Sequence, residues 1–165
     1  MNVAEKYDDL YAFKVKCATK ENAPEVLRVT HEAFALYAQL SGLTGKLDAL
    51  NETLEDVEND IKNKAVFIVE IDKEVVGAVR LKLNDDKTAY LSRFAVDEQH
   101  RNAGIGKILM RVVDSYLKSK GIKSVTLHTS SKVAPLIRFY YGRGFYIKSI
   151  EYSRNYPRAE MVKEY

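Results

Sequence analysis

One stretch in the middle of the chain, residues 90–120, constrains the fold more than any other. It has the pattern of a strand, a glycine-bearing turn and an amphipathic helix in direct succession. The strand prediction rests on a short run of β-forming residues, Tyr90, Leu91, Phe94, Ala95 and Val96. The helix prediction rests on apolar residues spaced three and four apart, which are Ile105, Ile108, Leu109, Val112, Val113, Tyr116 and Leu117. Gly121 then supplies a helix stop signal.

The turn in this stretch contains two glycines, Gly104 and Gly106, and two cations, Arg101 and Lys107. The first N–H groups of a helix lack intrahelical partners and carry the positive end of the helix dipole, so they bind phosphate oxygens. Glycine has no Cβ, so the backbone can approach a diphosphate closely, and the two cations add charge-assisted donors. The pattern therefore predicts a phosphate-binding turn. An ordinary strand-to-helix turn, with its glycines there for tight packing, is the alternative.

Two other phosphate-binding motifs do not match. The P-loop needs a glycine where Arg101 stands and Ser or Thr where Ile108 stands. The Rossmann fingerprint needs a third small residue at position 109, which is leucine. A general nucleotide-binding protein that uses the same turn is therefore a weaker interpretation.

Two motifs together resemble the GNAT superfamily of N-acetyltransferases. The hallmark of that family, Arg/Gln-x-x-Gly-x-Gly/Ala between a strand and a helix, is matched by Arg101-Asn102-Ala103-Gly104-Ile105-Gly106. A later block, residues 138–145, resembles the family's Tyr-x-x-x-Gly-Phe motif, with Tyr140 as the tyrosine and Gly144-Phe145 as its end. The similarity covers nearly the whole chain in the order of its elements.

The resemblance implies an N-acetyltransferase with acetyl-CoA as its co-substrate and a primary amine as its acceptor. The amine, on a small molecule or on a protein or peptide, would attack directly in a ternary complex. Tyr140 is the residue expected to protonate the departing thiolate, with simple packing beneath the cofactor as the alternative. The expected cofactor-binding residues are Phe94, Ala95, Val96, Arg101, Asn102, Ala103, Gly104, Ile105, Gly106 and Lys107. A binding module that senses acetyl-CoA without turning it over is the competing function.

The chain departs from the family pattern in two places. Many members carry an asparagine seven residues before the tyrosine, where this chain has Val133, and the sequence leaves open whether Ser130 or Ser131 replaces that contact. Members also place Glu or His on the central strand, where this chain has Tyr90 and Ser92. An amine of pKa ~10.4 is largely protonated at pH 7, so help with deprotonation is expected. Other candidates for that base are Glu32, Glu70, His31, His100 and His128, and the sequence does not choose among them.

Composition and charge limit the remaining possibilities. A length of 165 residues, 46% of them hydrophobic and 30% charged, fits one soluble domain over residues 1–165. The net charge of +3, without a basic block, gives no support for nucleic-acid binding. No apolar run approaches the ~20 residues of a membrane span, and the first residues lack the layout of a signal peptide, so we expect a cytoplasmic protein. The single cysteine, Cys17, excludes an intrachain disulfide or a multi-cysteine metal site, and no metal is expected.

The predicted architecture is a single-domain α/β fold, a mixed, mostly antiparallel sheet of about seven strands flanked by helices. Strands are expected at residues 13–17, 65–71, 75–83, 90–96, 122–129, 145–151 and 159–164. Helices are expected from residue 22, over 47–61, after the phosphate turn and over 132–141, the last interrupted early by Pro135. Residues 72–74 should close a hairpin, residues 40–46 should form a loop, and Cys17 should be a small core residue. The strand, helix, strand succession around residues 90–129 predicts one parallel pair.

The sequence does not identify the acceptor amine or the oligomeric state. An acidic series in the second helix, Glu52, Glu55, Asp56, Glu58 and Asp60, would suit a cationic acceptor, but a solvated outer face explains the same charges and is our prediction. In the family that this chain resembles, exposed late strands often pair, so a homodimer is among the states that the resemblance implies.

Overall fold

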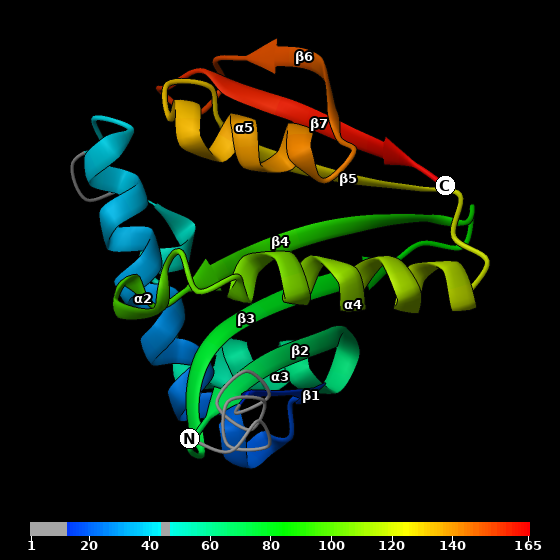
Figure 1. Ribbon diagram of the computed structural model, residues 1–165. Coiled ribbons are helices and arrows are strands. Elements are labelled where there is room, and N and C mark those ends of the chain that lie inside the picture. Colours follow the sequence, from blue (N-terminus) through cyan, green and yellow to red (C-terminus); the bar gives the residue numbers. More distant parts are fainter. Residues whose placement is uncertain (1–12, 44–46) are drawn as a thin grey trace, which may run out of the picture.

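The computed structural model describes residues 13–43 and 47–165, which form a seven-stranded sheet with helices on both faces (Figure 1). The strand order is β1-β2-β3-β4-β5-β7-β6, and every neighbouring pair is antiparallel except β4 and β5. The predicted α/β class and the mixed, mostly antiparallel sheet are therefore confirmed, and so is the single parallel pair.

The elements follow the predicted order closely. The strands are β1 (Phe13–Cys17), β2 (Ala65–Ile71), β3 (Glu74–Leu83), β4 (Thr88–Val96), β5 (Ser124–Ser130), β6 (Tyr146–Glu151) and β7 (Arg158–Glu164). The helices are α2 (Ala23–Leu40), α3 (Leu54–Asn63), α4 (Ile105–Ser119) and α5 (Ala134–Gly142), and three short 3₁₀ turns precede α2, α3 and α4. Asp72 and Lys73 close the β2–β3 hairpin with φ of 49° and 67°, the left-handed pair that suits a two-residue hairpin turn.

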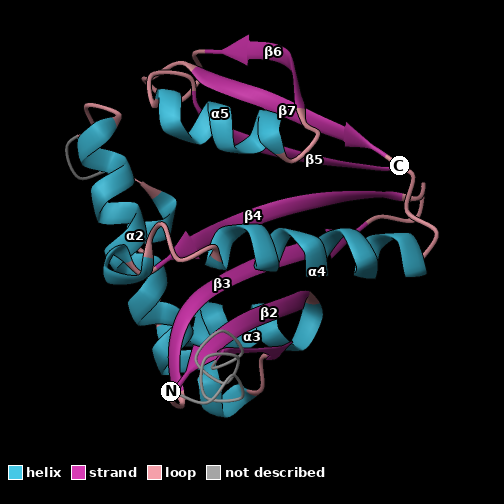
Figure 2. Cartoon of the chain, viewed as in Figure 1, coloured by secondary structure: helices cyan, strands magenta, loops and turns pink. Residues whose placement is uncertain are grey.

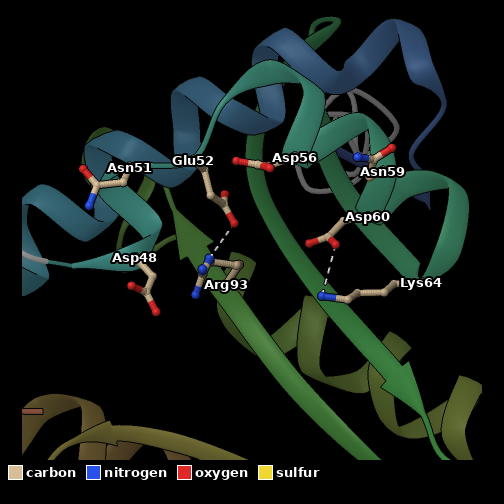
Figure 3. A pocket seen from close by; sticks show the side chains of 8 residues that line it. All are labelled: Asp48, Asn51, Glu52, Asp56, Asn59, Asp60, Lys64 and Arg93. Atoms are coloured by element: carbon tan, nitrogen blue, oxygen red, sulfur yellow. Dashed lines mark hydrogen bonds and ion pairs between the residues drawn. The ribbon is translucent and has the colours of Figure 1, made fainter.

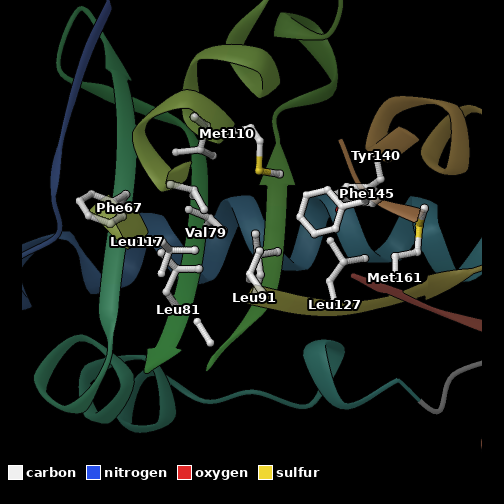
Figure 4. Packing of buried hydrophobic residues seen from close by; sticks show 14 of the residues in the cluster. Phe67, Val79, Leu81, Leu91, Met110, Leu117, Leu127, Tyr140, Phe145 and Met161 are labelled. Carbon is white, nitrogen blue, oxygen red and sulfur yellow. The ribbon is translucent and has the colours of Figure 1, made fainter. Parts of the chain in front are cut away.

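The two faces of the sheet carry different cores because strand residues alternate between them. Phe67 and Val69 of β2 pack in the larger core with α4, α5 and the later strands, whereas Ile68 packs with α2 and α3 on the opposite face. Figure 4 shows the larger core continuing from Phe67 past Leu91 to Met161, so one apolar layer joins both halves of the sheet.

The sheet opens between its two parallel strands. β4 and β5 pair only over residues 88–90 and 124–126, although they continue to Val96 and Ser130. Figure 2 shows the two strands diverging toward the carboxyl end of β4, where α2 and the start of α4 also lie. The end of β4 therefore has no neighbour on its β5 side, and this opening positions the candidate site.

The predicted helix over residues 47–61 is wrong in its first half. Asp48–Leu50 forms a 3₁₀ turn, and α3 begins only at Leu54. The cause is a capping box: the Thr53 hydroxyl accepts from the N–H of Asp56, and the Asp56 carboxylate accepts from the N–H of Thr53. The prediction that the acidic residues form a wholly solvated outer face of this helix is also wrong. Glu52 precedes the helix, and its side chain is only 10% exposed.

Two smaller predictions are also wrong. Cys17 is exposed, because β1 is an edge strand that pairs only with β2 and Cys17 is its last residue. Pro135 lies in the first turn of α5 and so starts the helix rather than interrupting it. Part of the predicted loop, residues 44–46, lies outside the described residues. Among the described helices, none combines the length and apolarity needed to span a bilayer.

Candidate active site

The predicted phosphate turn connects the open end of β4 to α4. Asp97 accepts from the N–H of Gln99 at 3.0 Å and starts a 3₁₀ turn over Glu98–His100. Gly104 then takes the left-handed conformation, with φ of 81°, as the N-cap of α4. The first N–H groups of the 15-residue helix that follows have no helical carbonyl to satisfy them.

A cavity of about 610 Å³ lies against this turn. All the predicted cofactor-binding residues line it except Ala95 and Ala103. Ala95 is buried within β4, and Ala103 is exposed on the turn. The structure therefore brings the strand end, the glycines and the cations Arg101 and Lys107 together on one wall.

The two glycines of the turn have different surroundings. A Cβ on Gly104 would meet no atom within 4 Å, so the cavity is open at that backbone. A Cβ on Gly106 would come within 3.3 Å of the Phe139 ring and 3.6 Å of the Phe94 ring. Gly106 therefore allows α4 to lie close to the aromatic wall of the cavity, while Gly104 leaves room for a ligand.

The opposite walls of the cavity come from α5, which carries the predicted Tyr140, and from α2, which the sequence analysis did not connect with the site. α5 contributes Val133 at its N-cap and Pro135, Leu136 and Phe139. α2 contributes Ala33, Phe34, Leu36, Tyr37 and Leu40. The Tyr37 and Tyr156 hydroxyls lie 3.1 Å apart, and this contact joins α2 to the segment before β7. The aromatic residues of α2 could be recognised as apolar in the sequence, but their orientation toward the turn could not.

Tyr140 lies directly under the cavity wall rather than in it. Its ring packs at 6.1 Å from Phe94, 5.3 Å from Phe139 and 5.7 Å from Phe145. Phe94 and Phe139 line the cavity, whereas Tyr140 does not. Burial raises the pKa of Tyr140, so its phenol carries its proton at neutral pH. Tyr141, its neighbour in the motif, is half exposed.

Val133, at the position of the family's asparagine, lines the cavity with an apolar side chain. Neither nearby serine lines the cavity with it. The Ser131 hydroxyl donates to the Pro157 carbonyl at 3.2 Å, and the Ser130 hydroxyl accepts from the N–H of Lys132 at 3.3 Å. The hydroxyls of both serines therefore bond to backbone groups outside the cavity lining.

Three of the base candidates have partners away from the cavity. Glu32 pairs with Arg28 at 3.0 Å, and Glu70 pairs with Lys16 at the same distance. The Nε2 atom of His31 lies 3.2 Å from the backbone carbonyl of Glu52, a residue that does not line the cavity. These contacts favour structural roles for all three residues.

The other candidates lie nearer the opening. His100 lines the cavity, with its Nδ1 atom 3.7 Å from Asp97. Tyr90 and His128 form a pair, in which the phenol oxygen is 2.7 Å from the imidazole Nδ1. Burial is the main cause that lowers the pKa of His128, and the positive charge of Arg158 adds to it. A neutral imidazole at the point where β4 and β5 separate can accept a proton there.

Comparison with known proteins agrees with this geometry. Residues 30–145, which include the turn, the cavity walls and the tyrosine block, match the sequence profile of the acetyltransferase (GNAT) family. The chain belongs to the GNAT family. Rat N-acetyltransferase 8F1 is 34% identical over 84 residues, which cover 48% of this chain and 38% of that protein. The chain thus matches well under half the length of this curated relative.

Solved GNAT structures share the fold. PaiA N-acetyltransferase from Thermoplasma acidophilum, crystallised with coenzyme A, has a TM-score of 0.82 at 20% identity, covering 93% of this chain and 99% of its own. An acetyltransferase from Bacillus anthracis, crystallised with acetyl-CoA, has a TM-score of 0.57 at 21% identity, covering 62% of this chain and 63% of its own. At these identities the likeness establishes the GNAT fold, and it carries no information about the acceptor.

Proposed function

We propose that this GNAT protein transfers an acetyl group from acetyl-CoA to a primary amine by direct attack in a ternary complex. The observation that supports it most is the cavity at the open end of β4. There Gly104 leaves the backbone accessible beside Arg101, Lys107 and the first turn of α4. Phosphate oxygens suit the charged rim, and a pantetheine arm suits the apolar walls of α2 and α5.

Each chemical requirement has a residue available for it in this proposal. Backbone N–H groups of residues 94–96, at the free end of β4, are suited to stabilise the developing oxyanion, a role worth ~3–4 kcal/mol where it has been measured. The acceptor nitrogen forms the new C–N bond, the C–S bond breaks, and the thiolate takes a proton. Tyr140 is the proposed donor of that proton, because burial keeps its phenol protonated.

The amine must also lose a proton before or during the attack. The Tyr90–His128 pair and His100 are the described groups near the opening that can accept it through water. We assign the role to none of them alone. An apolar wall built from α2, with Phe34 and Tyr37, favours an acceptor whose amine is carried on a partly apolar body.

The competing function is an acetyl-CoA sensor without turnover. The specific observation in its favour is that Tyr140 does not line the cavity, so its phenol would have to reach the sulfur through the aromatic wall. Enzymes often tighten such contacts only when substrates bind, so this geometry does not decide against catalysis.

Calorimetric titration with acetyl-CoA, CoA and ATP, followed by a thiol-release assay over a panel of amines, tests the proposal. We expect binding of the two CoA compounds, no binding of ATP, and amine-dependent thiol release. Binding without release on any amine would support the sensor. Tight binding of ATP alone would contradict both functions.

A further inference from the structure

Glu52 is the centre of a partly buried ion-pair network on the α2–α3 face of the sheet, and Figure 3 shows its contact with Arg93. Its two carboxylate oxygens accept from the terminal nitrogens of Arg80 at 2.7 and 2.8 Å. One of them also accepts from Nε of Arg93 at 2.8 Å. Arg80 is 1% exposed and has Asp60 as its second partner, at 2.8 Å. Glu52 therefore connects a fixed cation inside the protein with the side chain of Arg93.

Arg93 occupies an unusual backbone position. Its φ is 52°, in the left-handed region that residues other than glycine rarely adopt. The β3–β4 register shifts there, from Ala78 opposite Ala95 to Arg80 opposite Ser92. Two residues of β4 are thus set against one of β3, which is a β-bulge. Such a conformation persists only where the surroundings hold it.

The bulge adjoins the residues that form the cavity. Phe94, the next residue, and Val96 both line the cavity and pack on the core beneath α4. The Arg93 guanidinium also lies 5.9 Å from the ring centre of Phe34, which lines the cavity from α2. A change in the backbone of Arg93 would therefore reorient the strand end and disturb the opposite wall.

We propose that Glu52 is a positioning residue for the GNAT reaction: by holding Arg93 in its left-handed conformation, it sets the strand end at residues 94–96 for acetyl-CoA. The inference rests on the proposed function, because acetyl-CoA is the ligand whose binding it describes. Glu52 need not touch the ligand. Without the ion pair, the bulge relaxes in some of the protein molecules. The apparent affinity for acetyl-CoA then falls in proportion to the fraction of molecules that keep the binding conformation.

A polar hollow lies beside Glu52, and no bound ligand is needed to explain the ion pairs among the residues that line it. It has a volume of about 460 Å³, and several of its carboxylates already face cations. Asp60 pairs with Lys64 at 3.1 Å as well as with Arg80, and Asp48 pairs with Arg154 at 2.7 Å. This charge balance agrees with a positioning role.

Two substitutions of the same residue test the proposal. Arg93→Ala removes the ion pair and leaves a Cβ in the left-handed region, whereas Arg93→Gly removes the ion pair but accepts that backbone without strain. Calorimetric titration with acetyl-CoA should give an affinity about tenfold weaker for Arg93→Ala and within about threefold of wild type for Arg93→Gly. Rescue by glycine is an effect that loss of a direct ligand contact would not produce.

Glu52→Gln and Asp60→Asn form a matched pair, because both residues bind Arg80 but only Glu52 binds Arg93. Glu52→Gln should weaken acetyl-CoA binding about threefold to tenfold in the wild-type background and less than twofold when added to Arg93→Gly. Asp60→Asn should lower Tm and leave the affinity unchanged.

The outcomes separate this inference from the proposed function. If the wild-type protein does not bind acetyl-CoA, both are overturned. If wild type binds but Arg93→Ala and Arg93→Gly lose affinity equally, or neither loses any, only the positioning role is overturned. Should Arg93→Ala fail to fold, the Glu52→Gln series in the two backgrounds decides, and an equal loss in both would contradict the proposal.

Discussion

The phenol oxygen of Tyr90 lies 2.7 Å from Nδ1 of His128, and this contact bridges β4 and β5 where their pairing ends. Burial raises the pKa of Tyr90, while burial and then the charge of Arg158 lower the pKa of His128. At neutral pH both groups are therefore uncharged, and the tautomer of the imidazole decides which of them donates the hydrogen bond. The pair connects the parallel strands where they separate, while the Glu52–Arg93 ion pair connects β4 to the segment before α3.

The lowered pKa of His128 makes stability depend on pH in a defined direction. In the unfolded chain His128 binds a proton near pH 6.5, whereas in the folded protein it does so only at a lower pH. The contribution of His128 to folding stability is therefore fully present above pH ~6.5 and is lost as the pH falls through the folded pKa. Wild type should lose more Tm between pH 7.5 and 5.0 than His128→Gln does. Because the ring is only half-buried, the difference should not exceed ~2–4 °C.

Thermal denaturation at a series of pH values measures this difference. The charged groups that act on His128 are Arg158 and Glu160 of β7, Glu151 of β6 and Arg154 of the turn between them. Their own titration is common to both proteins, so it cancels in the comparison. Parallel curves for wild type and His128→Gln would show that His128 keeps an ordinary pKa in the folded protein.

Gly104→Ala should weaken acetyl-CoA binding by more than its effect on stability explains. Gly104 lines the cavity and a Cβ there would have no protein atom within 4 Å, so we expect a bound ligand rather than the protein to meet it. The left-handed backbone adds a stability loss of roughly 1–2 kcal/mol. Gly121→Ala is the control, because Gly121 has a similar φ of 70°, equal free space and a position beyond the far end of α4.

Urea denaturation and acetyl-CoA titration of both glycine variants separate the two effects. We expect similar losses of stability, but a loss of affinity of tenfold or more only for Gly104→Ala. Equal affinities in the two variants would mean that the turn is an ordinary connection and not the cofactor site.

Tyr140→Phe should lower kcat while acetyl-CoA still binds. The substitution keeps the ring that packs against Phe94, Phe139 and Phe145 and removes only the hydroxyl that would donate the proton. A general acid typically contributes 10²–10⁴-fold, and a loss confined to kcat marks an interaction made in the transition state. Tyr141→Phe, at a half-exposed position, should have little effect.

Steady-state kinetics on an amine found by the panel decides the role of Tyr140. Wild-type kcat in Tyr140→Phe would leave this tyrosine with a packing role only. A loss of kcat in Tyr141→Phe instead would transfer the acid role to the neighbouring residue.

Arg80→Ala should destabilise the protein by ~3–5 kcal/mol, because it leaves the carboxylates of Glu52 and Asp60 without their buried partner. Urea denaturation measures this loss directly. Combined charge reversal at Glu55 and Glu58 is the comparison, since Glu55 is exposed and the contact of Glu58 with Lys20 is long, at 3.9 Å. Exposed charges are screened over ~10 Å, so we expect a change below ~1 kcal/mol. Comparable losses in the two variants would place the outer acidic residues within the stabilising network.

The amino-acid sequence by itself determined the elements whose signals are local. The apolar spacing of three and four predicts α4, the short turn at Asp72 and Lys73 closes the hairpin, and the glycine turn begins its helix where the motif indicates. These predictions succeed because helix periodicity, turn conformation and capping depend on residues within a few positions of one another. Eight of the ten residues predicted to bind the cofactor line one cavity because they lie next to one another on a single strand–turn–helix unit.

Only the tertiary structure decided which distant residues meet. Glu52 contacts Arg80 and Arg93, which lie 28 and 41 positions away along the chain, and Tyr90 contacts His128, which lies 38 positions away. A residue's place in its own strand or helix predicts the face on which it lies, but not the element packed against that face. The same reason explains why Cys17 is exposed on an edge strand and why α2 became a cavity wall. The separation of β4 from β5 creates that cavity, and it depends on how the whole sheet packs between its two layers of helices.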